Sequence, residues 1–160
     1  MSAPALSVVV TLLNEEGSLE ELYRRTVTAL DGRPFELILV DDGSTDGTWA
    51  AVERLHAADP RVRAVRFKRN FGQHPAMHAG LSRARGEIVV TMDGDLQNQP
   101  EDIPRLVAAV EAGADVASGR RAARNDSWGR TLPSRLINGM LRRFTGVAIS
   151  DFGCAFNAYR

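Results

Sequence analysis

The chain has 160 residues, of which 44% are hydrophobic, with 20 basic and 20 acidic side chains. This length suits one domain with a buried core, and the balanced charge gives no indication of a nucleic-acid partner. The single cysteine, Cys154, excludes an internal disulfide. The N-terminal apolar run is short and follows no basic residues, and no apolar run is long enough to span a bilayer, so neither a signal peptide nor a membrane span is predicted.

Apolar runs rich in β-branched residues predict strands over 6–13, 35–40, 62–67, 87–92 and 115–118. Apolar residues at helical spacing predict helices between them. One covers 18–30, one follows an N-cap at Asp46, one carries Ala76 and Leu81, and one runs from Pro100 to a closing glycine, Gly113. A longer amphipathic helix is predicted over 127–144, and residues 147–160 are ambiguous.

The alternation of strands and helices predicts an α/β protein with a Rossmann-like, mostly parallel sheet and helices on both faces. Ligands of such sheets bind at the carboxyl ends of the strands. A polar cluster follows each predicted strand, and together these clusters predict a binding site on one edge of the sheet: Asn14-Glu15, Asp41-Asp42, Arg69-Asn70, Asp93-Gly94-Asp95 and Arg120.

The segment 87–100, EIVVTMDGDLQNQP, carries the most informative cluster. Two carboxylates two residues apart at the end of a buried strand repel each other and lose hydration, and a divalent cation offsets that cost. Mg²⁺ or Mn²⁺ fits Asp93 and Asp95, with Gln97 as a further oxygen ligand and Gly94 allowing a tight turn. The alternative is a polar turn with solvated acids.

Asp41 and Asp42 stand where a doubly wound fold often binds a nucleoside, although a turn followed by a helix cap would also explain them. The glycine-rich fingerprints of dinucleotide and mononucleotide sites are absent, so a pyrophosphate would have to be held through a metal.

Two other groups of residues are candidates for a site. His74 and His78 lie four residues apart but have no third metal ligand, so a histidine metal site is not predicted. Arginines cluster after residue 119 and suit an anion site or a solvated helix face. Nucleic acid is disfavoured because no aromatic platform lies among them. Cys154 is interpreted as a small core residue.

The motifs LSVVVTLLNEEGSLEEL, LILVDDGSTDGT, RNFGQHPAMHAGL, GEIVVTMDGDLQNQPEDIP and DSWGRTLPSRLINGMLRRFTG, together with DFGCAFNAYR, resemble family 2 glycosyltransferases of the GT-A fold. The resemblance covers nearly the whole chain and is greatest to the polyprenyl-phosphate glycosyltransferases. It implies one catalytic domain over 1–160, ending before a membrane-associated C-terminal part. It also implies a location at the cytoplasmic face of the cell membrane.

The resemblance also implies roles for individual residues. The nucleotide-sugar-binding positions are Thr11, Leu13, Asn14, Glu15, Asp41, Asp42, Arg69, Asp93, Gln97 and Arg120. The metal positions, for Mg²⁺ or Mn²⁺, are Asp93, Asp95 and Gln97. The acceptor-phosphate positions are Arg130 and Ser134, and the catalytic positions are Asp95, Arg130 and Asp151, the last as a base. The family usually has alanine at Gly94, proline at Gln99 and, in many members, proline at Thr11.

The implied reaction transfers a sugar from a nucleotide sugar, with a uridine diphosphate sugar favoured, to a polyprenyl phosphate with inversion. Three alternatives stay open: a binding fragment without turnover, a family 2 enzyme with another acceptor, and a phosphatase with an aspartyl nucleophile. The sugar and the oligomeric state, including a homo-oligomer, are not predicted.

Overall fold

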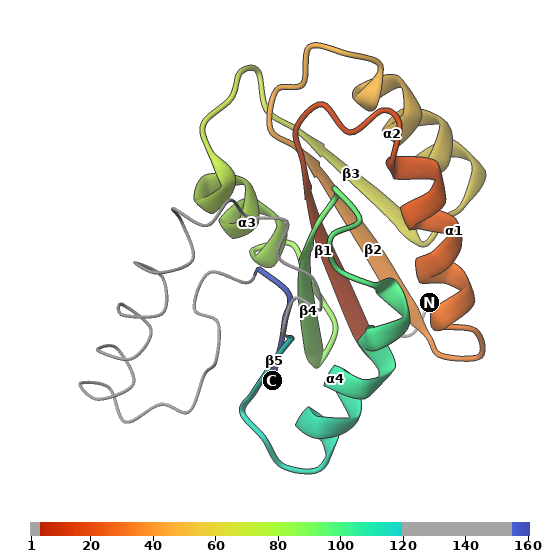
Figure 1. The fold of residues 1–160 in the computed structure, drawn as a ribbon, viewed down its shortest axis with the longest axis vertical. Coiled ribbons are helices and arrows are strands. Elements are labelled where there is room, and N and C mark those ends of the chain that lie inside the picture. Colours follow the sequence, from red (N-terminus) through yellow and green to blue (C-terminus); the bar gives the residue numbers. More distant parts are fainter. Residues whose placement is uncertain (1–3, 120–154) are drawn as a thin grey trace, which may run out of the picture.

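A computed structural model of the chain describes residues 4–119 and 155–160. Within them the chain forms one six-stranded sheet in the order β3-β2-β1-β4-β6-β5 (Figure 1). The strands are β1 (Leu6–Leu12), β2 (Phe35–Asp41), β3 (Val62–Arg66), β4 (Ile88–Asp93), β5 (Val116–Ser118) and β6 (Asn157–Tyr159). The pairs β1–β2, β1–β4 and β2–β3 are parallel, and β6 is antiparallel to both β4 and β5.

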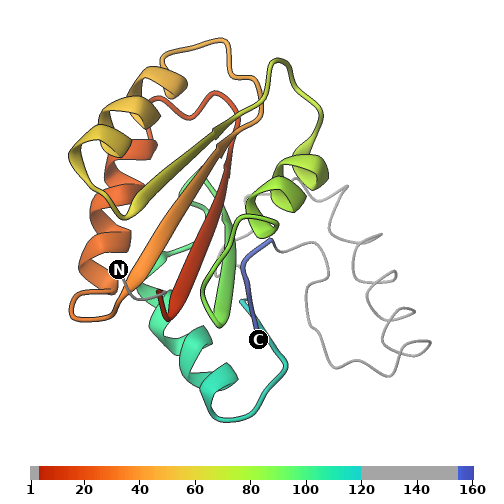
Figure 2. The same cartoon turned by 180° about the vertical axis from the view of Figure 1, so that it is seen from behind.

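Helices cover both faces of the sheet, as the alternating pattern predicted. They are α1 (Leu19–Ala29), α2 (Thr48–Ala58), α3 (Gln73–Leu81) and α4 (Ile103–Glu111), with a 3₁₀ turn (Pro100–Asp102) before α4. Figures 1 and 2 show α3 on one face and α1, α2 and α4 on the other. The fully buried strand β1 supplies both cores, because its side chains alternate between the faces. Val8 and Val10 pack in the larger core, and Val9 packs beside Ala76 of α3.

Two predictions about the elements need correction. The predicted fifth strand exists but is not parallel to its neighbour, because β6 lies between it and β4 and pairs with both in the opposite direction. β6 has only three residues and no clear alternating pattern, so it is recognised by its hydrogen-bonded pairing with β4 and β5 and not from its sequence.

The N-cap of α2 is Gly47, one residue after the predicted Asp46, yet the Asp46 carboxylate does accept the Thr48 N–H at 3.0 Å. The helix predicted over 127–144 lies outside the described residues.

The prediction for α4 is confirmed. All four apolar residues predicted for one face of α4 are buried, and Gly113 follows that helix with φ +109°. Among residues 4–119 and 155–160, no helix combines the length and the apolar character that crossing a membrane requires.

The end of the sheet opposite the strand carboxyl ends is held by a buried carboxylate. Glu36 is 3% exposed, and it accepts hydrogen bonds from the Ser7 hydroxyl at 2.7 Å and from the Arg85 N–H at 2.8 Å. Burial alone would raise the pKa of Glu36, but the hydrogen bonds from Ser7, Arg63 and Arg85 outweigh it and the pKa is lowered. This end of the molecule is therefore occupied by structural interactions, which leaves the other end for a ligand.

A second acid, Asp59, ties α1 and α2 to the start of β3. Its carboxylate accepts hydrogen bonds from the Tyr23 hydroxyl at 2.8 Å and from the Arg61 guanidinium at 2.7 Å. The Arg61 hydrogen bonds, opposed by burial, lower the pKa of Asp59 from 3.8 to about 2.

Asp59→Asn is expected to lower the free energy of unfolding by up to about 2.5 kcal/mol at pH 7, which is what a pKa shift of this size is worth. The folded-state pKa is depressed, so the stabilisation is present above about pH 4 and is lost as the pH falls toward 2. Urea unfolding at pH 7 and at pH 3 measures this. The exposed Asp31→Asn is the control and should have little effect at either pH. A loss for Asp59→Asn that is the same at both pH values would contradict this account.

Candidate functional site

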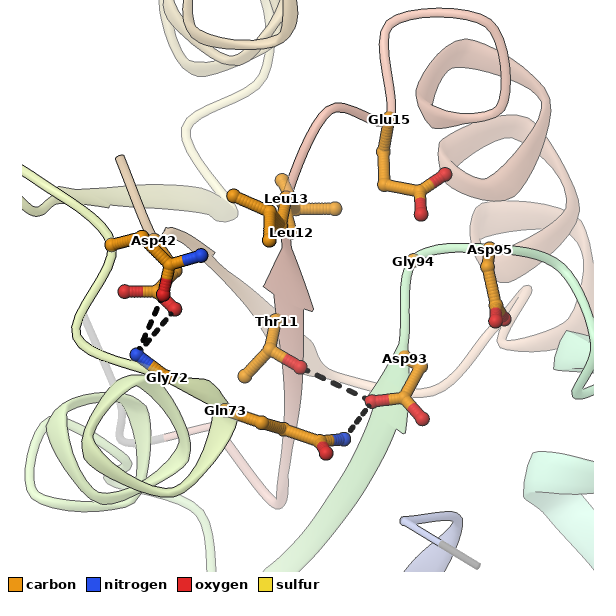
Figure 3. Close-up of a pocket in the computed structure, with 11 residues that line it drawn as sticks. Thr11, Leu12, Leu13, Glu15, Asp42, Gly72, Gln73, Asp93, Gly94 and Asp95 are labelled. Carbon is orange, nitrogen blue, oxygen red and sulfur yellow. Dashed lines mark hydrogen bonds between the residues drawn. The ribbon is translucent and has the colours of Figure 1, made fainter. Parts of the chain in front are cut away.

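A pocket of about 230 Å³ opens at the carboxyl ends of β1 and β4 (Figure 3). The parallel register places the end of each strand beside its neighbour: Thr11 pairs with Asp93, and Leu12 pairs with Asp41. Four of the five predicted polar clusters therefore reach this edge. The lining residues are Thr11, Leu12, Leu13, Glu15, Asp42, Asn70, Gly72, Gln73, Asp93, Gly94 and Asp95.

On one side of the pocket, two neighbouring side chains hold the Asp93 carboxylate. Its Oδ1 accepts a hydrogen bond from Thr11 Oγ1 at 3.2 Å and another from Gln73 Nε2 at 2.5 Å (Figure 3). Two donors on one oxygen stabilise the negative charge and fix the orientation of the carboxylate. Asp93 therefore faces the pocket in a defined conformation.

Asp95 is presented by a strained turn. Its Oδ1 accepts the backbone N–H of Gln97 at 3.0 Å, and the residue between them, Leu96, has φ +59°. A left-handed leucine costs roughly 1–2 kcal/mol, and such strain concentrates at functional sites. The predicted role of Gln97 as a metal ligand stays a prediction, because the contact seen here uses its backbone and its side chain does not line the pocket.

The reason for glycine between the two acids differs from the expected one. Gly94 is not among the residues with positive φ, so its backbone conformation is open to any amino acid. A Cβ on Gly94 would instead overlap Leu12 Cδ2 and lie 3.3 Å from the Thr11 carbonyl oxygen. What the chain needs at this position is space against β1 rather than an unusual turn.

The described residues contain no group of three or more His, Cys, Asp or Glu side chains placed to hold a metal ion. Asp93 and Asp95 nevertheless fit one kind of metal site. Mg²⁺ is commonly bound by one or two carboxylates together with substrate phosphates and waters. The donor set thus suits a divalent cation that binds together with a phosphate-bearing ligand.

Asp42 has a different task, on the opposite side of the pocket. It is 4% exposed, and its two oxygens accept the backbone N–H groups of Phe71 at 2.8 Å and of Gly72 at 2.9 Å. The carboxylate thereby fastens the loop between β3 and α3 against the end of β2.

The neighbouring Asp41 is fully buried and does not line the pocket. Its Oδ1 accepts the Ser44 N–H at 3.1 Å, whereas Oδ2 has no hydrogen-bond partner among the described residues and lies 3.7 Å from Arg66 Nε. The direct contact of Asp41 with a nucleoside stays a prediction, and the visible contacts of Asp41 support the turn that follows β2.

The other predicted site residues divide into three groups. Leu13 and Glu15 line the pocket, with Leu13 42% exposed. Asn14 instead accepts the Thr45 N–H at 2.9 Å and joins two loops, and Arg69 lies over the Phe71 ring beside a separate groove. The predicted residues that lie outside the described part of the chain are Arg120, Arg130, Ser134 and Asp151.

Sequence reasoning missed Gln73. It concentrated on His74 and His78, which are exposed and do not line the pocket. No local pattern around Gly72 indicates that the first side chain of α3 reaches the end of β4, and the contact of Gln73 with Asp93 depends on how α3 packs on the sheet.

A family model described as glycosyl transferase family 2 matches residues 7–160. The chain belongs to glycosyl transferase family 2. It is 50% identical over 159 residues to the undecaprenyl-phosphate 4-deoxy-4-formamido-L-arabinose transferase of Edwardsiella ictaluri, covering 97% of this chain and 49% of that protein.

Solved structures of GT-A glycosyltransferases share the fold. A mannosyltransferase from Pyrobaculum calidifontis, in complex with GDP-Man and Mn²⁺, matches 99% of this chain and 45% of its own, with a TM-score of 0.67 and 26% identity. Glucosyl-3-phosphoglycerate synthase from Mycobacterium tuberculosis, in complex with UDP, matches 98% of this chain and 56% of its own, with a TM-score of 0.74 and 26% identity. The predicted GT-A fold is confirmed, and the chain spans about half the length of these relatives.

Proposed function

We propose that this family 2 chain is the catalytic domain of an inverting glycosyltransferase that moves a sugar from a nucleotide sugar to undecaprenyl phosphate with a divalent cation. The observation that carries the proposal is the pair Asp93 and Asp95 at the mouth of the pocket, with Asp93 held in place by Thr11 and Gln73. A relative that is 50% identical bears the name of such a transferase.

The donor side of the proposal uses the described residues. Asp93 and Asp95 would hold Mg²⁺ or Mn²⁺, which neutralises charge on the departing nucleoside diphosphate. The neighbouring relative bound to GDP-Man and Mn²⁺ supports a metal of this kind. The loop fastened by Asp42 closes the other side of the pocket, where we place the nucleoside.

The acceptor side rests on sequence. An oxygen of the lipid phosphate forms a bond to the anomeric carbon while the bond from that carbon to the diphosphate oxygen breaks on the opposite face. A phosphate monoester has a second pKa of about 6, so it is already largely ionised near neutrality and needs positioning more than a strong base. Arg130 and Ser134 are assigned that positioning. Asp151 as a base is the weaker part of the proposal for the same reason.

The proposal includes a membrane context. A lipid acceptor places the reaction at a membrane surface, and we assign it to the cytoplasmic face, where nucleotide sugars are available. Contact with the membrane would come from the membrane-associated C-terminal part that the resemblance implies, and a homo-oligomer is compatible with this arrangement.

Transfer of radiolabelled sugar into organic-extractable lipid tests the proposed function. The protein should label lipid when undecaprenyl phosphate, a nucleotide sugar and Mn²⁺ are all present. Omission of any one should abolish labelling. Nucleotide-sugar binding without any transfer would favour the binding-fragment alternative, and labelling of a water-soluble acceptor would favour a family 2 enzyme with another acceptor.

A uridine diphosphate sugar is expected to bind more tightly than its guanosine counterpart. The solved relatives do not decide between the two bases, since they include both a UDP complex and a GDP-Man complex. The choice of uridine therefore rests on the resemblance to the polyprenyl-phosphate subgroup. A thermal-shift panel of nucleotide sugars with Mn²⁺ measures it, with UDP and GDP as references for the base alone. Preferential stabilisation by guanosine compounds would make the subgroup assignment wrong.

A further inference from the structure

Gln73 joins the two sides of the pocket. It is the first residue of α3, and its Nε2 donates to Asp93 Oδ1, the oxygen that also accepts from Thr11. Figure 3 shows the Gln73 side chain extending from α3 toward Asp93 at the end of β4. Gln73 is itself exposed, so no burial requirement forces this contact.

The position of Gln73 is set by the residue before it. Gly72 has φ +97°, a conformation that an L side chain rarely adopts, and its N–H donates to Asp42 and to Asn70 Oδ1. The helix behind Gln73 is also fixed, because Gly80 of α3 packs so closely on β1 that a Cβ there would overlap Val9 Cγ1. A continuous series of contacts therefore leads from Asp42, through Gly72 and Gln73, to Asp93.

The chemistry of the amide suits this place. A neutral N–H donor orients a carboxylate without cancelling its charge, whereas a lysine or arginine at the same position would compete with a cation. Partners of this kind are commonly worth 10- to 100-fold in metal affinity or activity. Ordering the carboxylate before the ligand arrives also removes part of the entropic cost of binding.

The geometry points to Gln73 as a positioning residue that holds Asp93 ready for the divalent cation and the donor diphosphate, and that couples the loop fastened by Asp42 to the metal side of the pocket. This inference rests on the proposed function, because it takes Asp93 as a metal ligand. It goes beyond that function by giving α3 and the β3–α3 loop a part in metal binding.

The variant Gln73→Met tests the inference, because methionine has a similar length but no N–H donor. His74→Ala, one residue further along α3 and exposed, is the matched control. Mn²⁺ affinity in the presence of saturating UDP is measured by calorimetry for the parental chain and both variants, together with UDP affinity in chelator and the melting temperature. We expect Gln73→Met to weaken Mn²⁺ binding on the order of 10-fold. UDP affinity in chelator and the melting temperature should stay near parental values, and His74→Ala should match the parental chain in every measurement.

Two failures are distinguishable. If the parental chain binds Mn²⁺ and Gln73→Met binds it equally well, the role of Gln73 is wrong and the proposed function stands. If the parental chain itself binds no Mn²⁺ with UDP, the metal-dependent function is wrong and this inference is wrong with it.

A second measurement covers the case in which Gln73→Met does not fold. The side-chain amide of Gln73, observed by nuclear magnetic resonance in the metal-free parental chain, should have one of its two proton resonances displaced by the hydrogen bond to Asp93. That displacement should disappear in Asp93→Ala. Identical Gln73 amide resonances in the parental chain and in Asp93→Ala would overturn the inference.

Discussion

Replacing Asp93 or Asp95 with asparagine is expected to lower sugar transfer on the order of 10²-fold or more. Loss of a side chain that only supports a metal ligand usually costs less than this. Asparagine keeps the size of the side chain but removes the charge that would hold the cation. In Asp93→Asn the amide oxygen can take the place of Oδ1 and accept from both Thr11 and Gln73, so the main change is the loss of charge. Initial rates at saturating donor, measured over a range of Mn²⁺ concentrations, check this expectation.

The control for both variants is Asp115→Asn, an exposed aspartate beside β5 and away from the pocket-lining residues. It should transfer sugar at the parental rate. Melting temperatures should remain similar for all three variants. In Asp93→Asn and Asp95→Asn, any lost contact is offset because the repulsion between the two carboxylates is also removed. If both Asp93→Asn and Asp95→Asn transfer sugar at the parental rate, the assignment of a metal-binding role to these two residues is wrong.

Arg130→Ala is expected to slow transfer by about 10²-fold while leaving donor affinity nearly unchanged. Arg130 and Ser134 are four residues apart in a segment predicted to be helical, so the prediction places them on one face. Arginine forms a planar fork that matches phosphate oxygens, and its charge-assisted hydrogen bonds are strong. A nucleophile misplaced by about 1 Å can cost 10²-fold in rate.

The measurement pairs transfer rates to undecaprenyl phosphate with matched donor titrations. Arg143→Ala, an arginine of the same predicted helix with no assigned role, is the control and should behave as the parental protein. Parental transfer by Arg130→Ala would contradict the acceptor assignment. Equal losses of donor affinity and transfer would instead place Arg130 on the donor.

The position of the site could be predicted from sequence because it depends on local patterns. The five strands other than β6 were visible as apolar runs, and the polar residues after the parallel ones had to meet at one edge of the sheet. Asp93 and Asp95 needed only the end of β4 to be placed correctly. The observed register, Thr11 beside Asp93, then brings the predicted residues together.

What sequence did not predict depends on contacts between distant segments. Asp41 and Asp42 are adjacent and look equivalent in the sequence. In the structure, Asp41 is buried and supports the turn after β2, whereas Asp42 fastens the β3–α3 loop. Gln73 lies 20 residues from Asp93, and only the packing of α3 on the sheet brings them together. Gly94 looked like a turn residue, whereas the side chain of Leu12 is what excludes a Cβ there.

The most direct test of the central claim is calorimetric titration of the chain with UDP in Mn²⁺ and again in chelator. The claim is that Asp93 and Asp95 bind a divalent cation together with the donor diphosphate. It predicts that UDP binds at least about 10-fold more tightly with Mn²⁺, and that Asp95→Asn loses this gain while keeping its affinity in chelator. Equal UDP affinity of the parental chain with Mn²⁺ and with chelator would contradict the claim.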